Sequence, residues 1–293
     1  MLDQASALRS IANLSARIPQ PERSQHQPVA IAITSGKGGV GKTNVVANLA
    51  VALANMRRKV TILDADFGLA NIDVLLGLAP RYNLRDFIFG DLGLEDIMVD
   101  GPQGVRIIPA SCGTEKMADL TTDQQSKLIH AISGMADETD YLLIDTAAGI
   151  SRNVINFLMA AGVVVVVTTP EPTAIVDAYL VIKILSRREP GKRISVLVNS
   201  VAGVHEAQSV FHQIDTAAQR FLDKPLELLG FIERDGNVLE AVRQQGPVTS
   251  LYPQSAASIC IKNVARTLDR QCRDIKKQQG LGLSWDQLFA TSE

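Results

Sequence analysis

A glycine-rich segment with two lysines follows the first apolar run and has the residue types that bind a nucleoside triphosphate. Residues 35–43 read SGKGGVGKT and match G-x-x-x-x-G-K-[ST] in full. Glycines let backbone N–H groups turn toward phosphate oxygens, and the helix that follows adds the positive end of its dipole. At this spacing Lys42 can reach the β- and γ-phosphates, and the Thr43 hydroxyl can ligate Mg²⁺. The predicted cradle consists of Gly36, Lys37, Gly38, Gly39, Val40, Gly41, Lys42 and Thr43.

Three aspartates stand at the ends of two apolar runs. Asp64 and Asp66 follow KVTIL, and Asp145 ends YLLID. Open α/β sheets bind ligands at the carboxyl ends of their strands, where an acid can hold Mg²⁺ directly or through water. Helix capping is the alternative role for either of the first two aspartates.

Three further polar residues have two possible roles each. Lys37 is either an exposed solubilising lysine or a charge that neutralises phosphate across a dimer interface. Asn199, which ends ISVLVN, either pairs with the edge of adenine or starts a turn. For Glu171 we expect helix capping, with ribose contact as the second possibility.

The sequence KGGVGKT at residues 37–43 resembles the deviant Walker A motif of the MinD/ParA class of P-loop ATPases. The resemblance implies an ATPase that uses ATP and Mg²⁺ and forms an ATP-dependent homodimer, in which Lys37 contacts the partner's nucleotide. DADFGLAN at 64–71 resembles switch I of that class. It implies that Asp66 orients the attacking water and that Asp64 supports the magnesium shell. By the same resemblance, Lys42 is catalytic with Lys37 and Asp66, Asp145 is the Walker B acid and Asn199 reads adenine.

The elements that must position these residues alternate between short apolar runs and amphipathic stretches. The apolar runs predict strands at 29–34, 59–65, 105–110, 141–146, 163–169, 194–200 and 226–232. Helical periodicity covers 42–56 and 123–135 and recurs at positions 175, 178, 182 and 185. We therefore predict an α/β fold with a mostly parallel sheet that has helices on both faces, a P-loop NTPase of MinD-like form with an N-terminal helical appendage.

Composition narrows the class of protein. The 293 residues are 46% hydrophobic with a net charge of −2, which favours a globular chain and argues against a DNA-binding ATPase. The longest apolar run, 157–167, is shorter than the roughly 20 residues that a bilayer requires. An acidic start and three scattered cysteines indicate neither a secretory signal nor a disulfide or CxxC framework. We expect a cytoplasmic protein, peripheral at the inner membrane or cell pole at most.

The first 18 residues form a separate unit. They have helical periodicity, and the polar, proline-rich residues 19–28 link them to an ATPase domain at 29–272. Residues 3–9, DQASALR, resemble the DQAxxLR motif of the FlhG/FleN family of flagellar-number regulators. That family's N-terminal helix stimulates FlhF, an SRP-type GTPase. We expect the partner-binding residues to be Asp3, Gln4, Ala5, Leu8 and Arg9. The resemblance also implies flagellar switch-complex proteins as partners. A flagellar transcriptional activator is a further partner that the sequence leaves open.

Residues 273–293 form the last unit, with an apolar face at 281, 285, 288 and 289. The family has a membrane-binding helix here. This stretch is short, has two glycines and carries Asp286 and Glu293, whereas interfacial helices usually have basic polar faces. Packing on its own domain, a protein partner and weak lipid binding by two copies all remain open.

Three other functions remain alternatives to control of flagellar number and placement. They are a MinD-type ATPase of cell division, a ParA-type DNA-partitioning ATPase, and an ATP-gated binding protein whose hydrolysis is incidental.

Overall fold

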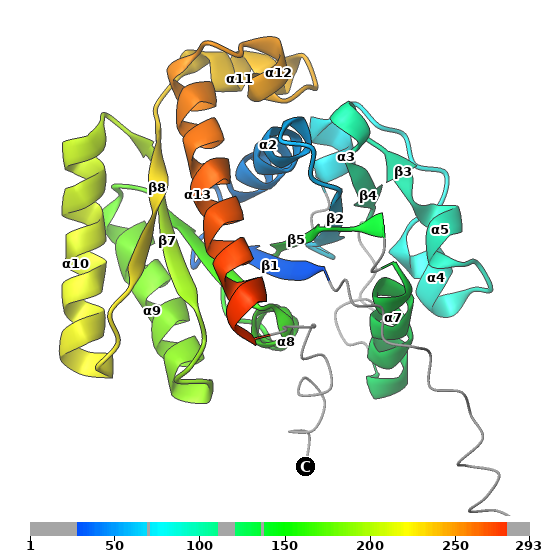
Figure 1. Ribbon diagram of the computed structural model, residues 1–293, viewed down its shortest axis with the longest axis horizontal. Helices are drawn as coiled ribbons and strands as arrows, with labels where there is room; N and C mark the ends of the chain where they lie inside the picture. The colour runs from blue at the N-terminus through cyan, green and yellow to red at the C-terminus, as the bar shows by residue number, and fades with distance from the viewer. Residues whose placement is uncertain (1–27, 69–70, 111–120, 136–137, 280–293) are drawn as a thin grey trace, which may run out of the picture.

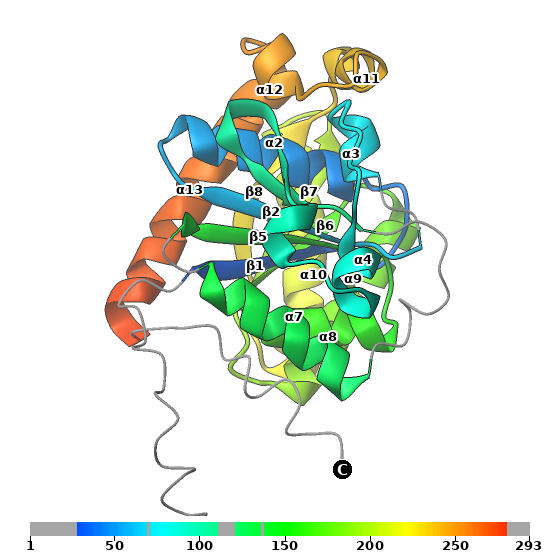
Figure 2. The same ribbon diagram turned by 90° about the vertical axis from the view of Figure 1, so that its right-hand side faces the viewer.

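The computed structural model describes residues 28–68, 71–110, 121–135 and 138–279. Within these ranges a single twisted sheet forms the middle layer (Figure 1). Figure 2 shows α2 (Lys42–Asn55) and α13 (Ala256–Gln279) on one face of the sheet, with α7 (Thr122–Gly134) and α8 (Arg152–Ala160) on the other. The predicted fold class is confirmed.

The described part of the sheet has eight strands in the order β3-β4-β2-β5-β1-β6-β7-β8. All neighbouring pairs are parallel except β3 with β4. Because parallel strands need crossovers, a helix follows most of them. The bounds are β1 Val29–Thr34, β2 Val60–Ala65, β3 Val99–Asp100, β4 Arg106–Ile108, β5 Tyr141–Thr146, β6 Val163–Thr168, β7 Ile194–Val201 and β8 Glu227–Glu233.

The predicted helices are present at nearly the expected bounds, the third of them as α9 (Pro172–Arg188). α13 continues past 272, where we expected the ATPase domain to end. The structure adds α3 Ile72–Leu75, α4 Leu84–Phe89, α5 Leu94–Ile97, the 3-10 turn η1 Pro102–Gly104, α10 Val204–Leu222, α11 Gly236–Arg243 and α12 Val248–Leu251. Among the described residues, none of the helices combines the length and hydrophobicity needed to cross a bilayer.

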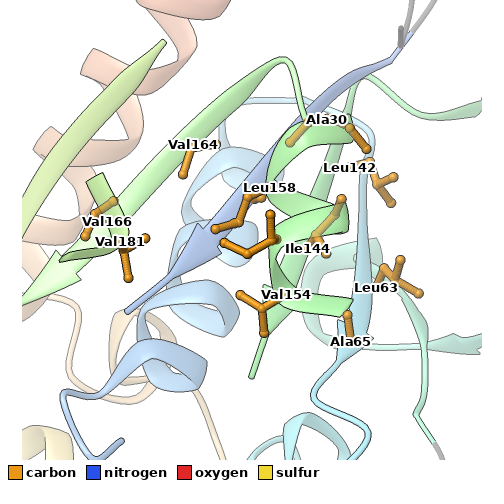
Figure 3. Packing of buried hydrophobic residues seen from close by; sticks show 14 of the residues in the cluster. Ala30, Leu63, Ala65, Leu142, Ile144, Val154, Leu158, Val164, Val166 and Val181 are labelled. Atoms are coloured by element: carbon orange, nitrogen blue, oxygen red, sulfur yellow. The ribbon is translucent and has the colours of Figure 1, made fainter. Parts of the chain in front are cut away.

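The central strands send alternate side chains into two separate cores. In β1, Ala30 and Ala32 face α8, whereas Ile31 and Ile33 face α2, and all four are at most 1% exposed. Burial on both faces explains why the strands are continuously apolar in sequence. Figure 3 shows the α8 side, where Val154 and Leu158 of the helix pack over β1, β5, β2 and β6, with Val181 of α9 in the same cluster. The labelled strand residues are Ala30, Leu63, Ala65, Leu142, Ile144, Val164 and Val166.

A buried carboxylate joins the last helix to the sheet. Asp269 of α13 has no exposed surface and accepts hydrogen bonds from Tyr141 Oη at 2.7 Å and Arg58 Nε at 2.8 Å, and it also pairs with Arg273. Burial raises the pKa of Asp269, but the bonds from Tyr141, Arg273 and Arg58 outweigh it, so the pKa lies below its ordinary value. The charged form of Asp269 therefore stabilises the fold.

Replacing Asp269 with asparagine should lower the free energy of unfolding by about 2 kcal/mol at pH 7, because three donors lose their charged acceptor. A carboxyl group with a lowered folded pKa stabilises above its unfolded pKa of about 4, and this stabilisation is lost as the pH falls through the folded value. The difference between the two proteins should therefore shrink below about pH 4. Urea unfolding measures it. Asp274→Asn, at an exposed position of the same helix, is the control.

Candidate nucleotide site

The glycine-rich loop joins β1 to α2 at the carboxyl edge of the sheet, as the motif predicts. Ser35 Oγ donates to the Lys37 carbonyl at 2.8 Å and closes the first turn of the loop. Gly36 lies against the start of α9. A Cβ there would meet the backbone of Asp177 at 2.2 Å, so only glycine fits. The loop thus lies between α2 and α9, which pack on opposite faces of the sheet.

Lys42 and Asp145 form a buried ion pair at the centre of the site. Lys42 Nζ lies 3.0 Å from Asp145 Oδ1, and the two side chains are 8% and 1% exposed. Burial raises the pKa of Asp145, while the charge and hydrogen bond of Lys42 act to lower it. The lysine that is expected to meet phosphate is therefore already fixed beside the Walker B acid.

Asp64 is the immediate neighbour of Asp145 across β2 and β5, as their register pairs them directly. Asp64 is 1% exposed, and its Oδ1 accepts the Asp66 N–H at 3.1 Å. Burial, followed by the nearby charge of Asp145, raises the pKa of Asp64 to about 8. Two adjacent buried carboxyls with raised pKa values form a place where a cation would be stabilised.

The residues present fit a magnesium ion. Asp145 Oδ2 is buried and has no hydrogen-bond partner in the described residues, so one carboxylate oxygen is left for a ligand. Thr43, at the start of α2, supplies the hydroxyl that the motif requires. Thr43, Asp145 and Asp64 would hold Mg²⁺ together with phosphate and water oxygens, where the ion neutralises charge on the phosphates.

Asp66 differs from the other two acids in being partly exposed. It lies just beyond β2, and its Oδ1 accepts the Gly68 N–H at 3.3 Å. Of the three acids, it is therefore the one that water can reach.

Lys37 contacts the loop after β6. Its Nζ lies 2.9 Å from Glu171 Oε2 and 3.1 Å from Thr173 Oγ1. The side chains of Lys37 and Glu171 are 37% and 59% exposed, so the pair is open to solvent and weak. Glu171 does occupy the N-cap position of α9, but its side chain makes no capping bond. The expected capping role is wrong because the carboxylate pairs with Lys37 instead.

Asn199 lies near the end of β7 and contacts the phosphate loop. Its Nδ2 donates to the Val40 carbonyl at 2.8 Å, and its Oδ1 accepts the Ser200 N–H at 2.9 Å. The structure thus brings Asn199 to the same site as the lysines and aspartates. Asp3, Gln4, Ala5, Leu8 and Arg9 lie outside the described residues.

No local sequence pattern predicts two of these contacts, Lys37 with Glu171 and Asn199 with Val40. The partners are 134 and 159 residues apart. The first becomes predictable only once β1 and β6 are known to be neighbours. Asp177, which shapes the loop at Gly36, was missed for the same reason.

A phosphate loop, a buried Lys–Asp pair and strand-end carboxylates on a parallel sheet define a P-loop nucleoside triphosphatase. The ParA family profile, described as "NUBPL iron-transfer P-loop NTPase", matches residues 27–269. The chain belongs to this family, the MinD/ParA class of P-loop NTPases, and is an ATPase.

Two relatives and one solved structure place it within the class. "Antiactivator FleN" of Pseudomonas aeruginosa is 46% identical over 84% of this chain and 88% of its own length. "Flagellum site-determining protein YlxH" of Helicobacter pylori is 35% identical, over 81% of each. The Pyrococcus horikoshii septum site-determining protein MinD, solved with Mg-ADP, has a TM-score of 0.70 at 28% identity and covers 86% of this chain and 99% of that one.

Proposed function

We propose that this ATPase controls the number and placement of flagella. The observation that carries the proposal is the 46% identity to FleN, which extends over 84% of this chain. The similarity to YlxH, also named for flagella, supports the same function. ATP and Mg²⁺ would drive a homodimer, and hydrolysis would return it to the monomer.

In this proposal Lys37 acts on the nucleotide of the partner subunit. The exposure of Lys37 supports the role, because its side chain is 37% exposed and is held by solvent-open contacts with Glu171 and Thr173. A partner's phosphate carries more charge than that carboxylate and is expected to displace it. Asn199 would contact adenine, while Lys42, Asp64, Asp66 and Asp145 act on the nucleotide of their own subunit.

The second part of the proposal is that residues 1–18 stimulate the GTPase FlhF. Asp3 and Gln4 carry the acceptor and donor groups to order a water in another enzyme's site, while Ala5, Leu8 and Arg9 hold the helix in place. The proline-rich residues 19–28 give the reach for action on a separate protein.

The full chain should therefore raise the GTP hydrolysis rate of purified FlhF, and the variant Asp3→Ala, Gln4→Ala should not. Peptide 1–18 should act like the full chain, and Ser6→Ala, inside the same motif, serves as the matched control. Phosphate release from GTP, with ATP omitted, measures the effect. Equal rates with the full chain and the double variant would remove the proposed action on FlhF and leave the ATPase intact.

A further inference from the structure

Asn199 makes its contacts from an irregular part of β7. The register between β7 and β8 shifts between Val198 and Val201, and Ser200 adopts a positive φ of 59°. That left-handed conformation is unfavourable for serine, and it is held by the bond from the Ser200 N–H to Asn199 Oδ1. The local backbone therefore sets the direction of the Asn199 carboxamide.

The carboxamide reaches the peptide group just before the start of α2. Asn199 Nδ2 donates to the carbonyl of Val40, whose side chain is 4% exposed in the core beneath the loop. The next residue, Gly41, is the N-cap of α2 with φ 85°. A Cβ on Gly41 would lie 2.6 Å from Asn199 Nδ2. The loop and the asparagine are thus in close contact at the residue that precedes Lys42.

This contact fixes the direction of one N–H group of the cradle. In a trans peptide the carbonyl and the following N–H point in opposite directions. Because Asn199 holds the Val40 carbonyl on its own side, the Gly41 N–H is turned away from Asn199. Backbone N–H groups of this loop are the groups that bind phosphate.

We propose that Asn199 is a positioning residue for phosphate binding, which acts by holding the Val40 carbonyl and so orienting the Gly41 N–H. A carboxamide has two N–H donors and two acceptor lone pairs on its oxygen, so one of each is still available for a base. The same side chain can therefore couple recognition of the base to the shape of the phosphate cradle. This role concerns the ATPase itself, and its failure would leave the proposed control of flagella untouched.

The test uses a ligand without a base, inorganic tripolyphosphate with Mg²⁺, beside ATP. In the full chain, Asn199→Ala should weaken tripolyphosphate binding by about tenfold, the value of one well-placed hydrogen bond, and ATP binding by at least as much. Asn199→Leu, which is neutral and similar in size, should do the same. Ser200→Gly keeps the carboxamide and should leave both affinities within twofold of the original. Titration calorimetry gives the dissociation constants, and thermal melting checks that each variant is folded.

Tripolyphosphate binding that stays within twofold of the original in Asn199→Ala would overturn the proposal, whether or not ATP binding falls. The ratio of kcat/KM for ATP to kcat/KM for GTP gives a second readout. Loss of a residue that acts through the loop lowers both values, and loss of its contact with adenine lowers the value for ATP further. A change confined to ATP would assign Asn199 to adenine alone and contradict the inference.

Discussion

Replacing Lys42 with methionine is expected to lower the rate of ATP hydrolysis by on the order of a thousandfold, the loss typical of removing one fixed group that stabilises developing charge. Methionine keeps the unbranched, buried stem but removes the charge. The ammonium lies 3.0 Å from Asp145, and this buried pair holds its position. Charge that is already in place needs no reorganisation during phosphoryl transfer, so its loss should act mainly on turnover.

The same substitution should also reduce stability, by about 3 kcal/mol, since it leaves the 1%-exposed Asp145 without its counter-charge. Adding Asp145→Asn to Lys42→Met removes both charges and should restore much of the lost stability, whereas activity should stay absent. This double variant separates folding from chemistry. Phosphate release and urea unfolding are the two measurements.

Lys262→Ala on α13 is the matched control, because its ammonium donates to the Pro253 carbonyl in an exposed hydrogen bond. This control should change neither the rate of ATP hydrolysis nor the free energy of unfolding. A Lys42→Met protein that keeps more than about a tenth of the original turnover would contradict the role that we assign to this lysine.

The layers of the fold are predictable because burial on both faces leaves a direct mark in the sequence. β1 and β5 begin and end at the predicted residues, since each of their side chains is buried. β3 has only two residues, Val99 and Asp100, and pairs antiparallel at the edge of the sheet. A strand so short shows no periodicity, and the sequence did not predict it.

The sequence predicts which residues form the site better than it predicts the contacts between them. The phosphate loop and the strand-end acids have fixed local patterns, so Lys42, Asp64 and Asp145 were identified individually. Their pairing depends on strand order, which places β5 between β2 and β1. The direction of the Asn199 carboxamide depends in addition on a shift in the register between β7 and β8. No local sequence pattern predicts that shift.

Asp66→Asn should lower ATP hydrolysis by about a hundredfold to ten-thousandfold, the range for losing a group that accepts a proton or orders water. ATP binding should survive, because the Lys42–Asp145 pair and the loop are unchanged. Asparagine can still accept the Gly68 N–H through its oxygen. If ATP drives the proposed dimer, the variant should therefore collect in the ATP-bound dimer. Single-turnover kinetics and sedimentation with ATP measure the two effects, and Asp73→Asn, on α3, is the control.

The same variant distinguishes the proposed function from its rivals. If control of flagella needs the full cycle, cells that carry Asp66→Asn should have an altered number of flagella and divide normally. Normal flagellation, from a protein that dimerises without hydrolysis, would favour an ATP-gated binding protein. Misplaced division septa would favour a division-site ATPase. Electron microscopy of single cells counts both features in the same sample, so a change at one partly exposed carboxylate tests the role of the whole chain.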